Sequence, residues 1–339
     1  MRCLTLADGL KKQGMHIRFV SRHLPEYLQN MLAEKGHEFV MLNSIQNDIP
    51  IDELAHASWL GVSQEQDAAD SVQALSDLMW DWIIVDHYAL DHRWESILRQ
   101  SSKKILAIDD IADRQHDCDV LLDQNFYTDM EMRYIDKVPS FCQLLLGPKY
   151  ALLREEFRLL HKQIKPRSGT VKRVIVFFGG VDADNYTGHI IDTLSEIGIS
   201  DLSVDVVIGL QHPNSEQIKA KCVQYEFNCH IQTDKMAELM AAADLAIGAG
   251  GSATWERCCL ALPTLTFSLA HNQTEIANGM DALGAGQYFD SNSYDINKDL
   301  YKTVLDLIND KSRIEMFSKK AYSIVDGCGV DRLSKVLMQ

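Results

Sequence analysis

A glycine-rich stretch in the second half of the chain, "GAGGSATWE" at residues 248–256, is the first candidate for chemistry. The apolar residues before it predict a buried strand that ends at Gly248, and Ser252 is suited to cap a helix that begins at Ala253. Backbone N–H groups at a helix start favour a phosphate, and Glu256 lies about one turn further on, within reach of a ribose. The alternative is a tight glycine turn followed by a solvated glutamate.

A second pair of glycines, in "FFGGVDADN" at residues 177–185, ends another expected strand. Gly179 and Gly180 could hold a diphosphate from one side. On the other side, Gly250 and Gly251 permit a positive φ and a close approach of the ligand to the backbone. Paired glycines often do no more than end a strand, but two such ends in one half of the chain favour a nucleotide site. Neither the Walker A nor the G-x-G-x-x-G spacing is present, so the sequence predicts no ATP or NAD motif.

The first half of the chain offers a polar cluster of a different kind. "VDHYALD" places Asp86, His87 and Tyr88 at the end of an expected strand. Asp109 and Asn125 follow two further strands. Ligands of open parallel sheets bind beyond the carboxyl ends of the strands, so acid–base chemistry is expected here. The alternative is that Asp86 and Asp109 cap the following helices and that His87 packs against them.

The elements that must position these residues alternate between strand and helix, which is typical of parallel sheets wound on both faces. "KPRSG" (165–169) has the composition of a linker, so two α/β domains are expected to meet near residue 160. Strands are expected at residues 15–22, 37–42, 80–86, 103–110, 118–126, 171–180, 202–209, 229–232, 243–248 and 262–270. Helices are expected at residues 1–14, 25–35, 65–79, 92–102, 150–163, 184–197, 214–226, 234–243, 253–261, 272–283 and within 311–339.

The 339 residues carry a formal net charge of −15, from 48 acidic and 33 basic side chains. So much negative charge repels nucleic acid and anionic membranes, and neither is an expected partner. The sequence shows no signal peptide and no apolar run of about 18 residues, so the cytoplasm is the expected compartment. The eight cysteines form no C-x-x-C pair and no zinc-ligand spacing, which indicates reduced thiols in the core.

Several of these segments occur together, in the same order, in a known family. They are "VDHYALD", "AIDD", "LLDQN", "GPKYALLREEF", "FFGG", "GAGGSATWE" and "HNQ". In these segments, which extend over nearly the whole chain, the sequence resembles the UDP-2,4-diacetamido-2,4,6-trideoxy-β-L-altropyranose hydrolases of pseudaminic acid biosynthesis. The last two segments are similar, more widely, to those of UDP-sugar glycosyltransferases of the GT-B fold, such as the peptidoglycan lipid II-forming enzyme.

The resemblance implies an α/β, GT-B architecture, in which two doubly wound, Rossmann-like domains face a cleft. Residues 1–158 would form the sugar-binding and catalytic domain, and residues 159–339 the UDP-binding domain. Water would attack the anomeric carbon of the UDP-linked sugar, UDP would leave and the configuration would invert. Backbone N–H groups would stabilise the departing diphosphate, so no metal or other cofactor is expected. The UDP-sugar is the expected partner, the chain is expected to be a monomer, and the free sugar would serve nonulosonate biosynthesis and flagellin glycosylation.

The resemblance also implies a role for each matched residue. The catalytic residues would be Tyr88, Asp86 and His87. The sugar-binding residues would be Asn125, Arg154, Asn272 and Gln273, although Asn272 could instead cap its helix. The nucleotide-binding residues, with the uracil near Thr233 and the ribose at Glu256, would be Gly179, Gly180, Thr233, Gly250, Gly251, Ser252, Ala253 and Glu256.

One part of the family pattern has no counterpart in this sequence. The family opens with a strand, a glycine-rich loop and "GH-x-x-R", whose histidine is the proposed catalytic base. Arg2 matches the arginine of that motif, whereas His16, His23 and His37 fall at other places in the pattern. We therefore expect a start codon assigned too late or a truncated chain, with a degenerate, inactive homologue as the alternative.

Three other functions stay open. A GT-B glycosyltransferase would pass the sugar of a UDP-N-acetyl sugar to an acceptor other than water. A UDP-sugar-binding homologue would bind the nucleotide without turnover. A UDP-sugar 2-epimerase shares the fold, but it usually needs several catalytic carboxylates and an arginine cluster, which the sequence does not place.

Overall fold

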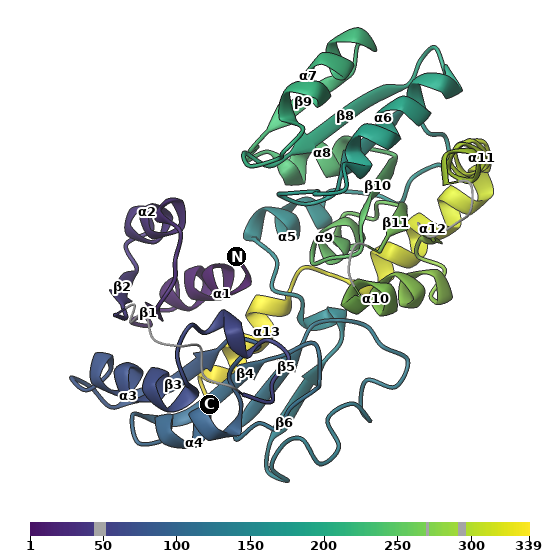
Figure 1. Cartoon of the computed structure of the whole chain (residues 1–339). Coiled ribbons are helices and arrows are strands. Elements are labelled where there is room, and N and C mark those ends of the chain that lie inside the picture. Colours follow the sequence, from purple (N-terminus) through teal and green to yellow (C-terminus); the bar gives the residue numbers. More distant parts are fainter. Residues whose placement is uncertain (44–51, 269–270, 291–295) are drawn as a thin grey trace. The chain divides into compact units, whose positions relative to one another are not determined.

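A computed structural model of the chain describes residues 1–43, 52–268, 271–290 and 296–339; the side chains of residues 271–273 and 296 lie outside the description (Figure 1). The chain divides into two compact units. Unit 1 comprises Met1–Asn125, Asp129–Leu152 and Gly329–Gln339, and unit 2 comprises Phe126–Thr128 and Leu153–Cys328. The sequence predicts a boundary after residue 158, whereas the chain leaves unit 1 after Leu152 and returns to it at Gly329.

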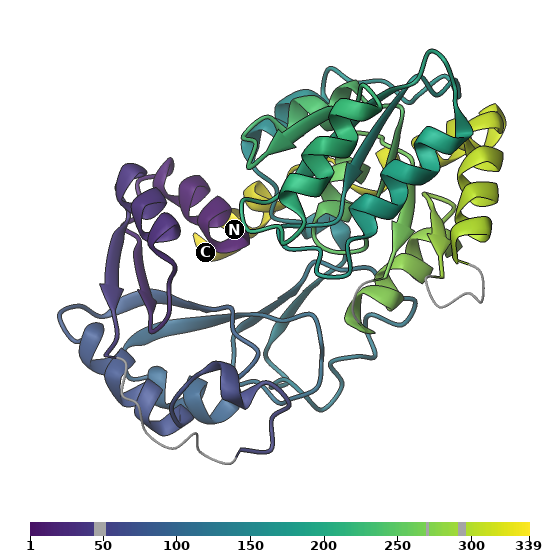
Figure 2. The same cartoon turned by 45° about the horizontal axis from the view of Figure 1, so that its top comes forward.

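Unit 1 begins with a helix, as the sequence predicts for residues 1–14. Its strands are β1 (Arg18–Ser21), β2 (Glu38–Met41), β3 (Trp80–Val85), β4 (Ser102–Ile108), β5 (Val120–Asp123) and β6 (Gln143–Leu146). Its helices are α1 (Arg2–Lys11), α2 (Glu26–Glu34), the 3₁₀ turn η1 (Ala57–Trp59), α3 (Gln64–Ala74), α4 (His92–Leu98), the 3₁₀ turn η2 (Pro148–Tyr150) and α13 (Gly329–Leu337). The strands form two separate parallel sheets, one of β1 and β2 and one in the order β3-β4-β5-β6 (Figure 2).

The four-stranded sheet of unit 1 is covered on both faces. Ile105 and Ala107 of β4 belong to an apolar cluster that includes Trp94 of α4. Leu106 and Ile108 belong to a second cluster, which includes side chains of α1 and α13. Because successive side chains of a strand point to opposite faces, these two clusters lie on opposite sides of the sheet. The near-continuous apolar sequence of β4 is therefore that of a strand buried between two layers of helix.

Unit 2 contains one six-stranded parallel sheet, in the order β12-β11-β10-β7-β8-β9. Its strands are β7 (Arg173–Phe177), β8 (Ser203–Ile208), β9 (Asn228–Ile231), β10 (Leu245–Ala249), β11 (Thr264–Phe267) and β12 (Gln287–Phe289). Its helices are α5 (Glu155–His161), α6 (Tyr186–Ile197), α7 (Ser215–Gln224), α8 (Met236–Ala242), α9 (Ala253–Cys259), α10 (His271–Ala282), α11 (Ile296–Asn309) and α12 (Lys311–Ile324).

The strand order of unit 2 reverses between β7 and β10. From β7 the chain builds outward through β8 to β9, and from β10 it builds through β11 to β12 in the opposite direction. The two central strands approach each other closely, because a Cβ atom added at Gly248 would lie 2.1 Å from the carbonyl oxygen of Phe177. In open α/β sheets this point of reversal is the usual place for a ligand.

Most predicted elements are present, but β6, β12, α11 and the 3₁₀ turns η1 and η2 were not predicted. The helix predicted at 150–163 is shortened to α5, because Ala151 and Arg154 have extended ψ angles of 126° and 148°. The last two residues of the strand predicted at 262–270 lie outside the described residues. Over the described ranges, no helix combines the length and apolar character that crossing a bilayer requires.

All eight cysteines are free, as the sequence predicts. Only four of these thiols are buried, and the others are half-buried, so the prediction that they belong to the core is wrong for part of the set. The buried thiols are Cys118, Cys222, Cys258 and Cys259.

The segment "KPRSG", predicted as a linker, is fixed in unit 2 by Arg167. The guanidinium of Arg167 is buried and donates hydrogen bonds to carbonyl oxygens at the ends of two helices. They are those of Met240 (3.0 Å), Ala241 (3.1 Å), Ala243 (3.0 Å) and Leu260. Burial lowers the pKa of Arg167 to about 10. Because terminal helix carbonyls lack partners inside their own helix, this one side chain satisfies groups of α8 and α9 together.

Replacing Arg167 by alanine is therefore expected to lower the free energy of unfolding by roughly 3 kcal/mol, because several buried carbonyl groups lose their donor. Urea unfolding followed by far-UV circular dichroism measures the change. Lys165→Ala is the matched control, because Lys165 is exposed in the same segment, and its effect should stay within about 0.5 kcal/mol. Equal urea midpoints for the two variants would show that Arg167 does not hold these helices.

Candidate functional site

The two glycine-rich loops of unit 2 follow neighbouring strands. Phe177 of β7 and Gly248 of β10 are paired in the parallel register. The loop with Gly179 and Gly180 and the loop that starts at Gly250 therefore leave the same edge of the sheet, one on each side of the point where the strand order reverses. The sequence predicted glycine-rich strand ends, and the topology brings them together.

Gly179 and Gly180 meet different requirements. Gly179 has a φ of 94°, which side chains rarely adopt, so the turn itself requires glycine. A Cβ atom added at Gly180 would meet no described atom within 4 Å. A Cβ atom added at Gly209 would lie 2.1 Å from the carbonyl oxygen of Gly180. The backbone of Gly180 therefore packs directly against Gly209 on that side of the loop. The open side of Gly180 is thus available to a ligand.

Helix α9 begins at Ala253, as the sequence predicts, but the predicted side-chain cap by Ser252 is not formed. The Thr254 amide donates to the Gly251 carbonyl at 2.9 Å, so the amides of residues 251–253 precede the first bond of the helix. The Gly250 amide is already used, because it donates to the Phe267 carbonyl at 2.8 Å. Ser252 is the N-cap and is exposed, but its hydroxyl makes no capping hydrogen bond, because its φ and ψ of −55° and −27° are already helical. Gly250 and Gly251 permit a positive φ, but neither is among the described glycines that adopt one.

Glu256 lies one turn into α9, where the sequence predicted a ribose-binding carboxylate. Its side chain is 22% exposed, and Arg154 Nη2 approaches its Oε1 at 3.8 Å. Burial raises the pKa of Glu256 above its usual value, against the opposing charges of Arg154 and Arg257. Arg154 also pairs with Glu156 at 2.8 Å. The structure thus brings Arg154, predicted to bind the sugar, beside the residue predicted to bind the ribose.

The other predicted residues of unit 2 lie at neighbouring strand ends. Thr233 follows β9, at the edge of the sheet, and accepts a hydrogen bond from the Lys235 amide at 3.1 Å. In the sheet, β9 is two strands away from β7 and three from β10, so Thr233 does not follow a strand next to either glycine loop. Asn272 and Gln273 belong to the first turn of α10, after β11, and their side chains lie outside the described residues.

In unit 1 the predicted residues Asp86 and Tyr88 belong to a hydrogen-bonded group that we call the Tyr88 cluster: Arg2, Asp86, Tyr88 and Asp110. Tyr88 donates its hydroxyl hydrogen to Asp110 Oδ1 at 2.5 Å. Arg2 donates to Asp86 at 2.7 Å and to Asp110 at 3.0 Å, so its guanidinium joins the two carboxylates. Burial acts to raise the pKa of Asp86, but the hydrogen bonds and charge of Arg2 outweigh it and hold that pKa below the usual range.

The environment of Tyr88 keeps its phenol protonated. Burial and the Asp110 carboxylate both raise the pKa of Tyr88 well above its ordinary value. The ring lies 5.4 Å from that of His56 and 6.0 Å from that of Trp59, measured between centroids. Trp59 is 58% exposed. An exposed aromatic face beside a hydroxyl–carboxylate pair is the kind of surface on which a sugar ring can stack.

His87, the third predicted catalytic residue, has a local role in the structure. Its Nδ1 accepts a hydrogen bond from the Ala89 amide at 3.1 Å, so the neutral ring carries its proton on Nε2. Burial lowers the pKa of His87 below its ordinary value. The ring therefore stays neutral, and half of its hydrogen-bonding capacity is used by the turn that follows β3.

Behind the Tyr88 cluster, the ends of β4 and β5 carry a buried group of charges. Tyr134 contacts Asp109 at 3.2 Å and Asp123 at 2.9 Å through its hydroxyl. Asp109 pairs with Arg114 at 2.9 Å, and His116 lies 2.8 Å from Glu95. Asn125, predicted to bind the sugar, is also buried, and its backbone N–H donates to Asp123 Oδ1 at 2.9 Å. Over the described residues, no group of three or more His, Cys, Asp and Glu side chains is placed to hold a metal ion.

These contacts contradict the capping interpretation of the strand-end acids, and the acid–base interpretation stays a prediction. Asp86 and Asp109 do not cap helices, because they bind Arg2 and Arg114, and the helix after β3 is capped by Asp91. The sequence did not predict that Asp110 would accept the Tyr88 hydroxyl. The only signal in the sequence was the second aspartate of "IDD", which is Asp110. Tyr88 and Asp110 are 22 residues apart, so no local sequence pattern connects them.

Comparisons with known proteins give one family model and several distant relatives. Residues 174–327 match the family model described as the glycosyltransferase family 28 C-terminal domain. An uncharacterized protein of Methanocaldococcus jannaschii is 22% identical over 276 residues, which are 79% of this chain and 55% of that protein. The UDP-2,4-diacetamido-2,4,6-trideoxy-β-L-altropyranose hydrolase of Campylobacter jejuni is 25% identical, over 64% of this chain and 78% of that enzyme. The spore coat polysaccharide biosynthesis protein SpsG of Bacillus subtilis is 26% identical, over 56% of this chain and 57% of that protein.

Solved structures extend the comparison over the whole chain. MurG of Acinetobacter baumannii superposes with a TM-score of 0.66 at 13% identity, over 99% of this chain and 95% of that one. The chain has the GT-B fold. The glycosyltransferase UGT89C1 of Arabidopsis thaliana superposes with a TM-score of 0.64 at 11% identity, over 100% of this chain and 96% of that one. At these identities the likeness concerns the fold, and it confirms the predicted fold class.

The buried charges of unit 1 predict a dependence of stability on pH. Burial acts to lower the pKa of His116, but Asp109 and Glu95 outweigh it and raise that pKa to about 9, from 6.5. A histidine whose pKa is raised by folding stabilises the fold fully below pH 6.5, and this contribution is lost as the pH rises through 9. The free energy of unfolding of unit 1 should therefore fall by on the order of 2 kcal/mol between pH 7 and pH 9.

Tryptophan fluorescence is the suitable measurement, because four of the five tryptophans belong to unit 1. Urea midpoints at several pH values would give the slope, and His116→Gln should flatten it. The same slope in this variant and in the unchanged protein would mean that another group titrates.

Proposed function

We propose that the protein hydrolyses a UDP-linked 2,4-diacetamido-2,4,6-trideoxy sugar at its anomeric carbon and releases UDP and the free sugar. The observation that carries the proposal is the pair of glycine-rich loops on both sides of the reversal point in unit 2. The relatedness to the Campylobacter jejuni enzyme, over 78% of that enzyme's length, supports the choice of substrate. The chain spans 55% and 57% of the length of the other two relatives.

UDP is assigned to unit 2. The amides at the start of α9 would hold one side of the diphosphate, and the open side of Gly180 would allow its oxygens to approach the backbone. Glu256 would accept hydrogen bonds from the ribose hydroxyls, and the loop at Thr233 would contact the uracil. These groups would also stabilise the charge that develops on the departing diphosphate, which is the main requirement of this reaction.

The proton acceptor is assigned to the Tyr88 cluster of unit 1. Water that attacks an anomeric carbon must lose a proton, and the Asp110 carboxylate can take it directly or through the Tyr88 hydroxyl. Tyr88 remains a neutral phenol, so it can pass a proton or orient the water but does not itself attack. Arg2 Nη1 donates a hydrogen bond to Asp110 Oδ2 at 3.0 Å, and the other carboxylate oxygen, Oδ1, accepts the Tyr88 hydroxyl hydrogen.

A GT-B glycosyltransferase is the second candidate. The family model that matches residues 174–327 favours it, because that model is named for a glycosyltransferase family. The chemistry of unit 2 would be unchanged, since both reactions expel UDP. The difference lies in the nucleophile, which would be a hydroxyl group of an acceptor instead of water.

The two candidates are distinguished by incubating the protein with UDP-2,4-diacetamido-2,4,6-trideoxy-β-L-altropyranose alone. Release of UDP and free sugar at equal rates supports hydrolysis. A requirement for an added acceptor supports glycosyl transfer. Binding of the UDP-sugar without turnover under both conditions would contradict both enzymes and support a binding protein.

Binding of UDP should depend on pH through Glu256. Because burial raises the pKa of Glu256, its carboxylate is lost at a higher pH than that of an ordinary glutamate, and UDP affinity should weaken early on acidification. Glu256→Gln should weaken binding about tenfold or more near pH 7.5 and should remove this pH dependence. Isothermal titration calorimetry between pH 5 and 8 measures both effects. 2′,3′-Dideoxy-UDP is the control ligand: if the variant weakens its binding equally, Glu256 does not contact the ribose.

Turnover should depend on the pair formed by Tyr88 and Asp110. Asp110→Asn removes the proton acceptor and should lower kcat by about 10²- to 10⁴-fold, and Tyr88→Phe should lower it by a similar factor. The double variant should lose little more than either single variant, because the two groups act as one unit. UDP affinity should stay unchanged in all three, since UDP is assigned to unit 2. A kcat within about threefold of the unchanged protein in Asp110→Asn would remove Asp110 from the mechanism.

A further inference from the structure

Two cysteines of unit 1 that are far apart in the sequence have their sulfur atoms in contact. Cys118 Sγ lies 3.6 Å from Cys142 Sγ, and the two residues are 24 positions apart. Cys118 is fully buried, whereas Cys142 is half-buried. We call these two residues the β5–β6 thiol pair. Neither belongs to the Tyr88 cluster or to the glycine-rich loops, so the proposed function makes no use of them.

The parallel pairing of β5 with β6 brings the two cysteines together. Val120 pairs with Gln143, and the Gln143 backbone N–H donates to the Asp119 carbonyl at 2.9 Å. The cysteines come just before these paired residues. Cys118 belongs to the apolar cluster on the α4 side of the four-stranded sheet, and Cys142 packs against the same cluster. Both thiols therefore lie on one face of the sheet, at the start of neighbouring strands.

This arrangement suits a disulfide bond. Neighbouring strands are about 4.8 Å apart, and disulfides join residues whose Cα atoms are about 4.4–6.8 Å apart. To form the bond, the two sulfur atoms must approach each other by roughly 1.5 Å. The Cys142 side can take up this movement, because β6 is the last strand in the order β3-β4-β5-β6 and Cys142 ends a turn in which its backbone N–H donates to the Pro139 carbonyl.

The two thiols differ in how easily they lose a proton. The hydrogen bond with Cys118 lowers the pKa of Cys142 against the opposing effect of burial, and the charge of His116 adds to the lowering. His116, whose pKa is about 9, carries that charge near neutral pH. The same hydrogen bond, together with burial, raises the pKa of Cys118 well above its ordinary value. Cys142 is therefore the thiol that becomes a thiolate, which is the form that reacts with oxidants.

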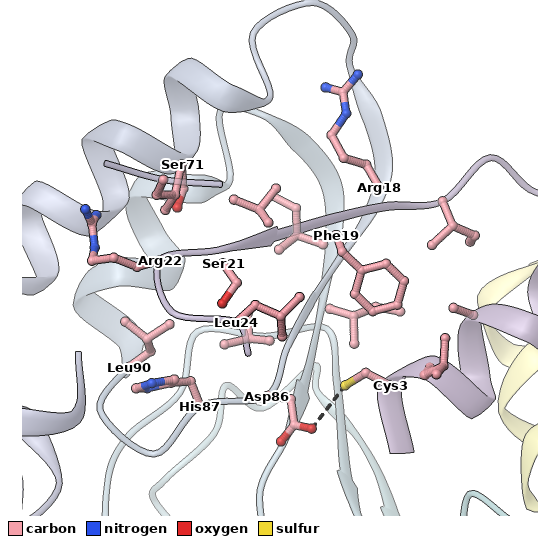
Figure 3. A pocket seen from close by; sticks show the side chains of 18 of the residues that line it. Cys3, Arg18, Phe19, Ser21, Arg22, Leu24, Ser71, Asp86, His87 and Leu90 are labelled. Carbon is pink, nitrogen blue, oxygen red and sulfur yellow. Dashed lines mark hydrogen bonds between the residues drawn. The ribbon is translucent and has the colours of Figure 1, made fainter. Parts of the chain in front are cut away.

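Cys3, another half-buried cysteine of unit 1, lies in a different environment. It lines a cavity of about 600 Å³, and its Sγ donates a hydrogen bond to Asp86 Oδ2 at 3.0 Å (Figure 3). Burial and the charge of Asp86 raise the pKa of Cys3 well above its ordinary value. Cys3 is thus held as a thiol, so half-burial alone does not make a cysteine of this chain reactive.

We propose that the β5–β6 thiol pair is a site of reversible oxidation, at which a hydroperoxide converts Cys118 and Cys142 into a disulfide. The Cys142 thiolate attacks one peroxide oxygen, the O–O bond breaks, and the other oxygen takes up a proton and leaves as water or an alcohol. The sulfur of Cys118 then attacks the sulfenic acid formed on Cys142. The S–S bond forms, and the sulfenic hydroxyl leaves as water with the proton of Cys118. The two thiols together lose two electrons and two protons, which the hydroperoxide accepts.

The disulfide would fix both ends of the segment between the two cysteines. This segment includes Tyr134, whose hydroxyl contacts the strand-end carboxylates of Asp109 and Asp123. A cross-link between the ends of a segment reduces the number of open conformations that it can adopt. Oxidation therefore restricts the opening of the part of the chain that covers these buried acids.

The test exposes the reduced full chain to hydrogen peroxide and maps its disulfides by mass spectrometry of peptides prepared without reducing agent. The unchanged protein should give a peptide that joins Cys118 to Cys142, and dithiothreitol should restore both thiols. Cys142→Ser should give no disulfide at Cys118. Cys118→Ser keeps the first step, so dimedone, which labels sulfenic acids, should label Cys142 roughly tenfold more than in the unchanged protein. Cys328→Ser, at another half-buried cysteine, is the matched control and should leave the joined peptide unchanged.

Three results with the unchanged protein would overturn the proposal. Oxidation of Cys142 to a sulfenic or sulfinic acid without the joined peptide would show that Cys118 cannot reach it. Two free thiols at a peroxide concentration that oxidises them in the urea-unfolded chain would show that the fold protects the pair. An equal yield of the joined peptide from the folded and the unfolded chain would show that the fold does not select this pairing. None of these results depends on a variant that folds or on the proposed hydrolysis.

Discussion

Parallel pairing is the constraint on which the other features of this protein depend. Every described pair of neighbouring strands, in both units, runs parallel. All strands of a sheet therefore end at one edge, and the residues that follow them are brought together although they are far apart in the sequence. In unit 2 this edge carries two glycine-rich loops and the start of α9, which suit an anion. In unit 1 it carries carboxylates, an arginine and a tyrosine, which suit proton transfer.

The carboxylates at the edge of unit 1 would repel one another without the partners that surround them. Arg2 lies between Asp86 and Asp110, and Arg114 pairs with Asp109. Asp123 is treated differently, because burial, with a smaller addition from the charges of Asp110 and Asp109, raises its pKa to about 7. It therefore retains its proton for part of the time near neutral pH, which reduces the charge that the edge has to accommodate.

The sequence predicted well the features that depend on near neighbours. The strand ends at Tyr88 and at Gly248, and the helix that starts at Ala253, follow from apolar runs and from glycine and serine at fixed offsets. Partners far along the chain were not predictable. Arg2 and Asp86 are 84 residues apart, and no local pattern connects them. Arg167 was mistaken for part of a linker because composition cannot show that its guanidinium reaches the ends of two helices. Short elements such as β12, with three residues, are held by their neighbours in the sheet more than by their own propensity.

The position of α13 has a consequence for how the molecule is made. This helix closes one face of unit 1, with Leu333 fully buried in the cluster that contains Leu6 and Leu106. Unit 1 otherwise ends at Leu152, so the ribosome must add all of unit 2 before α13 is synthesised. At ordinary rates of translation this takes roughly 10 to 40 s. During that interval the nascent unit 1 presents an uncovered apolar face, while unit 2 can already fold, so this face is where a chaperone has the longest opportunity to bind.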